Sequence, residues 1–145
     1  MWKRGVYIMS LQEELESIVR EFHADSGTIH LIKADHQLHL AAAYQIPEVV
    51  LDRVRVVPIG KGMAGLAAER RLPVTVCNIQ SDLSGDVRPG AKLTGMEGAI
   101  ALPMLDDTGK VGGVLGIANR AERTFTAEEE NALMKKGRQL LLCPR

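Results

Sequence analysis

The residues best suited to chemistry lie where a glycine turn leads into a helix. Gly60-Lys61-Gly62 provides the turn, and the helix formers from Met63 to Arg71 follow it directly. The first turn of a helix presents unpaired backbone N–H groups and a partial positive charge. We therefore expect Gly62 to Gly65 to form one wall of a small-ligand pocket, the alternative being that the glycines serve the turn alone. The spacing differs from that of a phosphate-binding loop, so nucleotide hydrolysis is not expected.

The two cysteines, Cys77 and Cys143, follow no C-x-x-C or zinc-binding spacing. A reduced, intracellular setting is the simplest interpretation of this pattern. Thiol chemistry at Cys77 would require a neighbouring base to activate the sulfur, and none is visible in the sequence. We expect Cys77 to be a buried residue at the end of a strand.

Two histidines lie on neighbouring strands of a predicted hairpin, which spans Thr28 to Lys33 and Gln37 to Tyr44. A two-residue turn at Asp35-His36 places His30 and His39 diagonally on one face of this hairpin. The same register assigns the other face to the core residues Ile29, Leu31, Leu38 and Leu40. A metal or acid–base role for the two histidines lacks a third ligand, so the preferred interpretation is that both are ordinary half-exposed strand residues.

Composition argues against several classes of function. At 145 residues the chain has the size of one domain and can bury a core without disulfides or metal. Basic and acidic residues number 18 each, so no global charge attracts nucleic acid or an anionic membrane. Aromatic residues make up 3%, too few for a surface that stacks single-stranded nucleic acid. The N-terminal apolar run is too short for a signal peptide or a membrane span, so we expect a soluble cytoplasmic protein.

Helix signals mark both ends of the chain. Ser10-Leu11-Gln12-Glu13 is a capping box, and the amphipathic helix that it opens continues to Phe22. Thr126-Ala127-Glu128-Glu129 is a second capping box, which opens a helix to about Leu142. These two helices have the apolar faces needed to pack on a sheet.

Between these helices the sequence predicts a short helix at Glu48 to Arg53 and strands at Arg55 to Ile59 and at Val74 to Val76. The polar segment from Cys77 to Gly90 is long for a plain connection. A binding lid and a plain surface loop with one helical turn explain this segment equally well.

An apolar hairpin is predicted at Gly98 to Leu105 and Lys110 to Asn119. A strand without polar alternation is buried on both faces, so both sides of the sheet must be covered. The glycines of the second strand indicate either close approach by a helix or a cavity; they are Gly112, Gly113 and Gly116.

Several motifs together carry a resemblance to a known family. They are Gly27 with the strand after it, Ile59-Gly60-Lys61-Gly62-Met63-Ala64-Gly65, Pro73-Val74-Thr75-Val76, Ala99 to Met104, Gly113 to Ile117, and Phe125-Thr126-x-x-Glu129. With the order of elements around them, they resemble the GAF domain family. The resemblance implies one domain over residues 10–142, with a disordered lead-in at 1–9 and a tail at 143–145. It implies an α+β, PAS-related fold: an antiparallel sheet of about six strands, terminal helices on one face, and short helices with a ligand-pocket loop on the other.

Three branches of this family have characteristic residues that can be compared with this chain. The branch that reduces free methionine sulfoxide has a cysteine at the position of Ala64 and further cysteines in the following loop, where this chain has none after Cys77. The tetrapyrrole-binding branch attaches its chromophore through a cysteine followed by histidine, and Cys77-Asn78 lacks this pair. The cyclic-nucleotide branch has a signature that Asn119-Arg120, Phe125 and Glu129-Glu130 follow with substitutions. Its ion pair is a structural clamp that says little about the ligand, and Arg120 would compete for Glu129 with the capping box.

The resemblance implies a stand-alone GAF-type sensory module that binds a small molecule, and we expect it to act without catalysis. The implied pocket residues lie at the helix start, on a lid within Asn78 to Gly98, and on a central strand; they are Gly62, Met63, Ala64, Asp82, Thr94, Ala99 and Ala101. The alternative is an interaction module that forms a homodimer through its terminal helices. A thiol enzyme such as a methionine-R-sulfoxide reductase is a lesser alternative. The ligand, any cofactor and the signalling partner are not named by the resemblance.

Overall fold

The computed structural model describes residues 9–82, 87 and 89–142. The elements in chain order are α1 (Leu11–Glu21), β1 (Ser26–Ile32), β2 (Leu38–Tyr44), α2 (Glu48–Val54), β3 (Val56–Val57), α3 (Gly62–Arg70), β4 (Val74–Val76), the 3₁₀ turns η1 (Ile79–Ser81) and η2 (Pro89–Thr94), β5 (Gly98–Leu105), β6 (Val111–Asn119) and α4 (Ala127–Leu142). The strand predicted at 55–59 is shorter than expected, because Pro58 has no backbone N–H for a sheet ladder.

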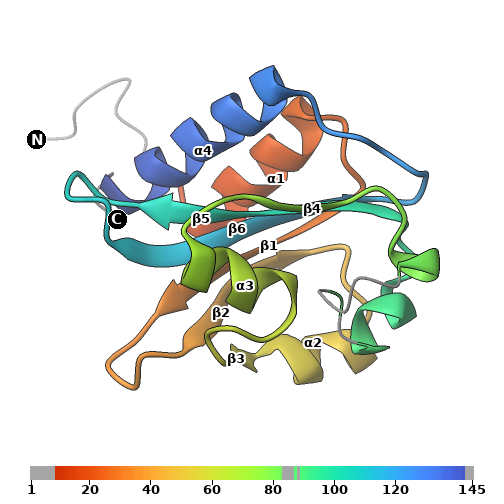
Figure 1. Cartoon of the computed structure of the whole chain (residues 1–145), viewed down its shortest axis with the longest axis horizontal. Coiled ribbons are helices and arrows are strands. Elements are labelled where there is room, and N and C mark those ends of the chain that lie inside the picture. The colour runs from red at the N-terminus through yellow and green to blue at the C-terminus, as the bar shows by residue number, and fades with distance from the viewer. Residues whose placement is uncertain (1–8, 83–86, 88, 143–145) are drawn as a thin grey trace, which may run out of the picture.

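The strands form one antiparallel sheet in the order β3-β2-β1-β6-β5-β4. Helices α1 and α4 pack on one face, and α2 and α3 lie on the other (Figure 1). The chain therefore has the α+β architecture that the sequence predicts, with two layers of helices around a central sheet. None of the described helices has the length and apolar character needed to cross a bilayer.

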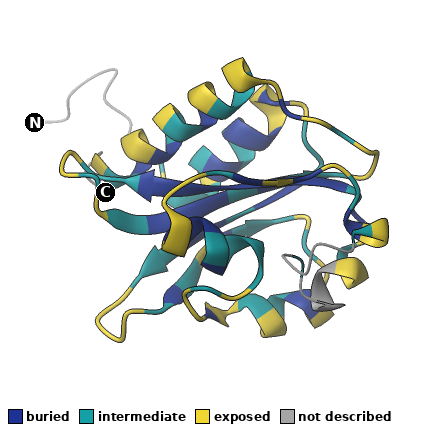
Figure 2. Ribbon diagram, viewed as in Figure 1, coloured by how far each residue is buried: buried dark blue, intermediate teal, exposed yellow. Residues whose placement is uncertain are grey.

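Strand β5 separates two different sides of the core. Seven of its eight residues are buried, and large and small side chains alternate along it (Figure 2). Ile100, Leu102 and Met104 pack with α1 and α4, where Leu15 and Leu133 are fully buried. The small residues of the strand point the other way, toward α3. The face toward the terminal helices is therefore densely filled, and the opposite face has less side-chain volume.

Both predicted capping boxes are confirmed. The Glu13 N–H donates to Ser10 Oγ over 3.1 Å, and the Ser10 N–H donates to the Glu13 carboxylate over 3.1 Å. The same reciprocal pair joins Thr126 and Glu129, over 3.1 and 2.9 Å. These bonds satisfy N–H groups that have no partner inside a helix.

The loop between β1 and β2 contradicts the predicted two-residue turn. The Lys33 N–H donates to the Gln37 carbonyl over 3.1 Å, and the His36 N–H donates to the Lys33 carbonyl over 2.9 Å. His36 is in the left-handed region, with φ 60°. These features describe a three-residue loop, in which a turn is followed by one left-handed residue. Between this loop and a β-bulge at Ile29/His30, the pairing of the strands is therefore shifted by one residue from the predicted register. Beyond the bulge, Ile29 pairs with Ala42 as that register predicts.

The shift moves the side chains of Leu38, His39 and Leu40 to the face opposite the predicted one. His30 pairs with Leu40, so the leucines of β2 share the face of His30 and not that of Ile29. His39 pairs with Leu31 on the other face, so the predicted histidine pair is wrong. His39 Nε2 lies 2.8 Å from Asp35 Oδ2 instead.

The apolar faces of the terminal helices are used inside one subunit. Leu15, Ile18 and Val19 of α1 are buried, as are Leu133 and Leu140 of α4. Leu142 is the one large apolar residue that is exposed among the described residues of these two helices. Homodimerisation through these helices stays a prediction, and exposed apolar surface on them does not add to its support.

Candidate ligand pocket

A cavity of about 600 Å³ lies between the sheet and the layer formed by α2, α3 and the 3₁₀ turns. Its floor consists of residues from β1, β5 and β6, and its walls come from the helices and the loop after η2. The lining comprises Ser26, Gly27, Thr28, His30, Ile46, Val50, Arg53, Val54, Val57, Lys61, Gly62, Met63, Ala64, Ile79, Thr94, Met96, Ala99, Ile100, Ala101, Val114, Gly116, Ile117 and Ala118. This volume and a mostly apolar lining with a few polar groups are typical of small-molecule sites.

The cavity exists because the floor is built from small residues. Ala99 pairs with Ala118, and Ala101 pairs with Gly116, so four small side chains lie side by side on this face of the sheet. A Cβ at Gly116 would lie 3.2 Å from Thr28 Oγ1 and would meet little else. Protein interiors are otherwise close-packed, so a hollow of this size reflects a specific choice of residues. The predicted cavity near the glycines of β6 is confirmed at Gly116.

The glycine-rich turn places the first residues of α3 against the cavity. Gly60 and Gly62 have φ of 89° and 66°, which side chains disfavour. Gly65 allows the helix to contact the preceding turn, because a Cβ there would collide with the Pro58 carbonyl oxygen. Lys61 is the N-cap residue and gives no side-chain cap. The first N–H groups of α3 therefore lack a side-chain cap from the N-cap residue, and Gly62, Met63 and Ala64 line the cavity.

His30 brings a buried polar group to the floor of the pocket. Its side chain is 2% exposed, so the predicted half-exposed position is wrong. Nε2 lies 2.7 Å from the Val54 carbonyl oxygen, which can only accept a hydrogen bond, so Nε2 carries the proton. Burial lowers the pKa of His30 below its ordinary 6.5, with the Val54 bond opposing this shift, and the ring is neutral. Nδ1 is then an acceptor, and it is buried without a hydrogen-bond partner in the described structure.

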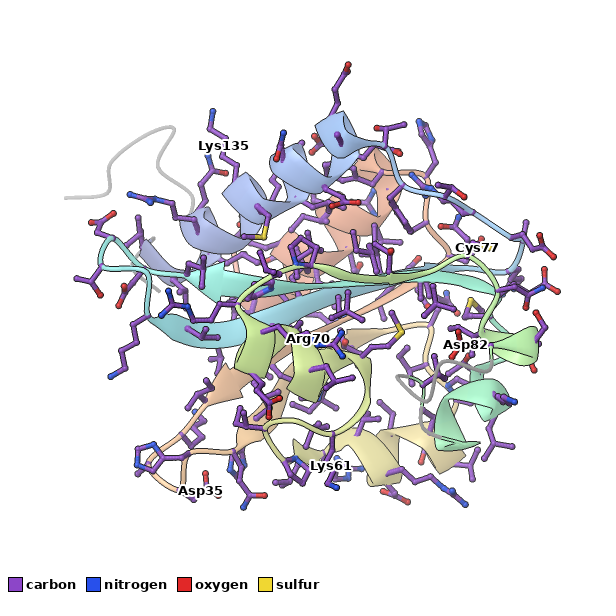
Figure 3. The ribbon with its side chains drawn as sticks, in the orientation of Figure 1. Asp35, Lys61, Arg70, Cys77, Asp82 and Lys135 are labelled. Carbon is purple, nitrogen blue, oxygen red and sulfur yellow. The ribbon has the colours of Figure 1, made fainter. Side chains whose placement is uncertain are left out.

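Two of the described side chains that line the cavity carry a charge at neutral pH, and both are basic. Arg53 of α2 and Lys61 before α3 line the cavity and are exposed, so they lie where it opens to solvent. Lys61 is labelled in Figure 3. Among the described residues that line the cavity there is no aspartate or glutamate, and the ion pairs of the described chain involve neither of these cations. The described part of the lining therefore carries net positive charge.

The segment after β4 contributes to the wall through its 3₁₀ turns. Gln80 Nε2 donates to the Met96 carbonyl over 2.9 Å, and the Met96 N–H donates to Thr94 Oγ1 over 3.0 Å. These bonds hold Thr94 and Met96 beside the cavity. Residues 83–86 and 88 of the predicted lid lie outside the described residues. The surface-loop interpretation of this segment included one helical turn, and a 3₁₀ turn is present there as η1.

Six of the seven predicted site residues line this one cavity: Gly62, Met63, Ala64, Thr94, Ala99 and Ala101. Asp82 is not among the lining residues. That these residues bind a ligand stays a prediction. The lining also includes residues that were not predicted as pocket residues: the alternating polar residues of β1, which are Ser26, Thr28 and His30, and the cations Arg53 and Lys61. The period-two polar pattern of β1 could have indicated a strand face that lines a cavity and not a core.

Cys77 lies at the end of β4 and is exposed, so the prediction of a buried strand-end residue is wrong (Figure 3). It is not among the residues that line the pocket. Cys143 lies outside the described residues. Within the ranges that the structure describes, no three histidine, cysteine, aspartate or glutamate side chains gather as a metal site would require.

The predicted clamp at the start of α4 uses a different arginine. Arg123 Nη2 donates to Glu129 Oε2 over 2.6 Å, while Glu129 Oε1 accepts the capping bond from Thr126, so the two interactions do not compete. The Thr126 N–H and the Arg123 guanidinium hold the pKa of Glu129 below its usual value. Arg123 also lies 4.3 Å from the centre of the Phe125 ring and donates to Asn119. This cluster ties the end of β6 to α4.

These features define a class of protein: an α+β domain with a pocket on one face of its sheet and two packed helices on the other. The family model of the GAF domain matches residues 10–140, and the chain belongs to the GAF domain family. No curated protein matches the chain. Family membership supports a sensory, ligand-binding or regulatory module.

Solved structures share the fold at low sequence identity. The GAF domain of an Acinetobacter phosphoenolpyruvate-protein phosphotransferase is 20% identical, with a TM-score of 0.75 over 92% of this chain and 81% of that chain. A free methionine-R-sulfoxide reductase from Neisseria meningitidis, solved with its substrate, is 20% identical, with a TM-score of 0.73 over 90% and 72%. A type II free methionine-R-sulfoxide reductase from Thermoplasma acidophilum is 16% identical, with a TM-score of 0.66 over 88% and 84%.

The two reductases overturn the expectation that this chain is not an enzyme. They share its fold over most of its length, so the fold is common to enzymes and to GAF domains of other proteins. That expectation depended on the positions of the cysteines. These positions argue against one thiol mechanism, but they do not argue against catalysis in general.

Proposed function

We propose that this chain is a GAF-type sensory or regulatory module whose pocket binds a small organic molecule. The observation that carries the proposal is the group of small residues on the floor, Ala99, Ala101, Gly116 and Ala118, which leaves about 600 Å³ in an otherwise packed domain. The residues around a cavity of this size lack van der Waals contacts on one side, and a bound molecule would supply those contacts. The few polar groups along its wall would give such a molecule a defined orientation.

Native mass spectrometry of freshly purified protein tests this proposal directly. We expect a defined extra mass on the folded chain, and the same spectrum reports the number of subunits. The bound molecule is then released, identified and incubated again with fresh protein. Recovery of the molecule unchanged indicates sensing, while recovery of a product indicates that the pocket also catalyses a reaction.

Ala99→Leu provides the matched variant, because its larger side chain would occupy the pocket. We expect the extra mass to disappear, with the chain still folded. Ala41→Leu is the control, since Ala41 is exposed on β2 and is not among the lining residues. An extra mass that persists in Ala99→Leu would place the bound molecule elsewhere and contradict the proposal. Wild-type protein that neither retains nor takes up any small molecule would also contradict it.

A further inference from the structure

We propose that α2 is a movable wall of the pocket and that pH controls its opening: a neutral His30 ring holds α2 in place, and protonation of the ring releases it. This inference rests on the proposed function, because it concerns the regulation of the same pocket. It follows from the way the ring holds α2, from the small number of other contacts that hold this helix, and from the charges around the ring.

The His30 ring closes the C-terminal end of α2 from the sheet. Its Nε2 donates to the carbonyl oxygen of Val54 over 2.7 Å, and Val54 is the last residue of α2. The last carbonyls of a helix have no N–H partner inside the helix, so the ring provides a donor that this carbonyl lacks. The bond therefore ties α2 to the central strand β1.

α2 is the element of its layer that can open most easily. Exposing the ring requires a movement on the pocket face, because β1 is hydrogen-bonded to β2 on one side and to β6 on the other. α3 packs on four strands and has three buried residues, whereas α2 packs mainly on β2 and η2 and buries Val50. Four of the seven α2 residues are exposed (Figure 2). An element with few buried apolar contacts opens locally at a lower free energy than the core does.

Protonation of the ring is unfavourable while α2 is in place. Nδ1 is buried without a hydrogen-bond partner in the described structure, so a proton on it would have no acceptor. Burial lowers the pKa of His30, and the bond to Val54, which favours the charged ring, offsets this only in part. When α2 moves away, water can solvate the charged ring and accept from Nδ1. Protonation therefore favours the open state.

The groups around the ring do not compensate a positive charge on it. β1, β3 and β6 contain no titratable residue besides His30. β2 carries His39, whose positive charge lowers the pKa of His30 further. The charged residues of α2 and of the two turns that follow it are all exposed; they are Glu48, Asp52, Arg53, Arg55 and Lys61. Among these, the two that line the cavity are the cations Arg53 and Lys61, and Asp52 pairs with Arg55 over 3.1 Å.

Opening of α2 would change access to the pocket. Val50, Arg53 and Val54 of this helix line the cavity, and so does Ile46 just before it. A displacement of α2 removes this wall, while the floor strands β5 and β6 stay paired. A molecule that contacts α2 inside the pocket holds the helix in place, and by linkage it also opposes protonation of His30. As the pH falls, the pocket therefore opens more often and exchanges its contents faster.

The direction and size of the effect follow from the proton balance. In the open state His30 has the ordinary pKa of histidine, about 6.5, and in the closed state its pKa is lower. The open population is therefore constant above about pH 7, rises as the pH falls through about 6.5, and levels off below the pKa of the closed state. Between about pH 7.5 and pH 5.5 we expect the open population to rise about two- to tenfold.

Hydrogen–deuterium exchange of the full chain over this pH range measures the opening, after correction for the intrinsic exchange rate at each pH. We expect the α2 amides from Leu51 to Val54 to be less protected than the core, and their protection to fall about two- to tenfold. The last turn of α4 is the internal control, because its fraying does not expose His30. A fall of less than about twofold in α2 would overturn the inference. So would α2 protection equal to that of the core, since α2 would then open only when the whole chain unfolds.

Two substitutions assign the effect to one ring. His30→Gln has an amide nitrogen the same number of bonds from the backbone as Nε2, so it can bind the Val54 carbonyl but does not titrate. We expect α2 protection in this variant to be independent of pH. His39→Gln removes the neighbouring imidazole and should retain most of the pH dependence. Dependence that persists in His30→Gln, or that disappears in His39→Gln, would show that another group controls α2. If His30→Gln does not fold, the wild-type and His39→Gln profiles still decide.

Oxidation by hydrogen peroxide tests whether the opening reaches the pocket. Met96 lines the cavity and is 5% exposed, and its thioether does not titrate, so its oxidation rate reports access. We expect this rate to rise on acidification by the same factor as the opening of α2, in wild type and not in His30→Gln. Met134 is half-buried on α4, reacts without opening of the pocket and should not respond. A Met96 rate that does not change, or that changes equally with Met134, would contradict the inference.

The two proposals fail in different ways. A native mass spectrum with a defined adduct, together with α2 protection that does not depend on pH, would leave the proposed function standing and overturn this inference. A spectrum without an adduct, from protein that also takes up no small molecule, would overturn the proposed function whatever the exchange data show.

Discussion

His30 Nε2 lies 2.7 Å from the carbonyl oxygen of Val54, and this hydrogen bond joins the central strand β1 to the end of α2. The bond decides the tautomer of the ring, and burial keeps the ring neutral. One contact thus holds a wall of the pocket in place and determines which nitrogen is left as an acceptor. Several consequences of the structure can be measured without knowing the ligand.

The neutral state of His30 predicts a pH dependence of folding stability. Because burial lowers the pKa of His30 below 6.5, the unfolded chain takes up the proton first as the pH falls. The stability from neutral His30 is complete above about pH 6.5 and is lost progressively below it, with a slope of up to about 1.4 kcal/mol per pH unit. Urea unfolding of wild type and His30→Gln between about pH 5 and pH 8 measures this difference. Identical pH profiles would contradict a buried neutral ring, since the other histidines are present in both proteins.

Two glycines of β6 predict different effects of the same substitution. A Cβ at Gly116 would make one tight contact, 3.2 Å from Thr28 Oγ1, which a small shift of that side chain can relieve, so Gly116→Ala should change the stability by no more than about 0.5 kcal/mol. A Cβ at Gly113 would collide with the His30 carbonyl oxygen, so Gly113→Ala should destabilise by about 2 kcal/mol or more. Thermal unfolding of the two variants measures the contrast. Equal losses of stability would contradict the difference in surroundings between Gly116 and Gly113.

The Arg123–Glu129 ion pair predicts a stabilising clamp between β6 and α4. Both side chains are partly buried, and Arg123→Met keeps the aliphatic stem while removing three hydrogen-bonding groups. We expect Arg123→Met to destabilise the fold by about 1.5–3 kcal/mol, the usual range for a hydrogen bond to a charged group. A double-mutant cycle with Glu129→Gln should show a coupling of about 1 kcal/mol. Additive losses would mean that the pair contributes nothing, and Arg120→Met serves as the control for the general loss of charge.

The left-handed conformation of His36 predicts that glycine is better at this position. With φ 60° at the last residue of the three-residue loop, His36→Gly should stabilise the fold by up to about 1 kcal/mol, because the strain of the side chain is removed. Chemical denaturation measures the change. NMR contacts between the strands should still pair Ile32 with Leu38 in this variant. Pairing of Ile32 with His39 would show that the loop has two residues and would contradict the register described here.

The elements of the fold that depend on neighbouring residues could be predicted from the sequence. The two capping boxes, the apolar hairpin and the GKGMAG turn are local patterns, in which residues a few positions apart contact one another. For the same reason the start of α3 was found as a pocket wall. The identity of the arginine that pairs with Glu129 was missed, because the sequence spacing does not distinguish Arg120 from Arg123. In the structure, Arg123 lies over the Phe125 ring and donates to Glu129.

The sequence by itself determined which residues form strands and helices, because periodicity, caps and turn residues act over short distances. Only the tertiary structure decided what those strands present to the interior. A loop of three residues in place of two moved the leucines of β2 to the face of His30, and the packing of α2 buried that ring and used its Nε2. The hollow above Ala99, Ala101 and Gly116 likewise results from strands that pair across the sheet. Such pairing joins residues far apart in the chain, so no local pattern specifies the site that it creates.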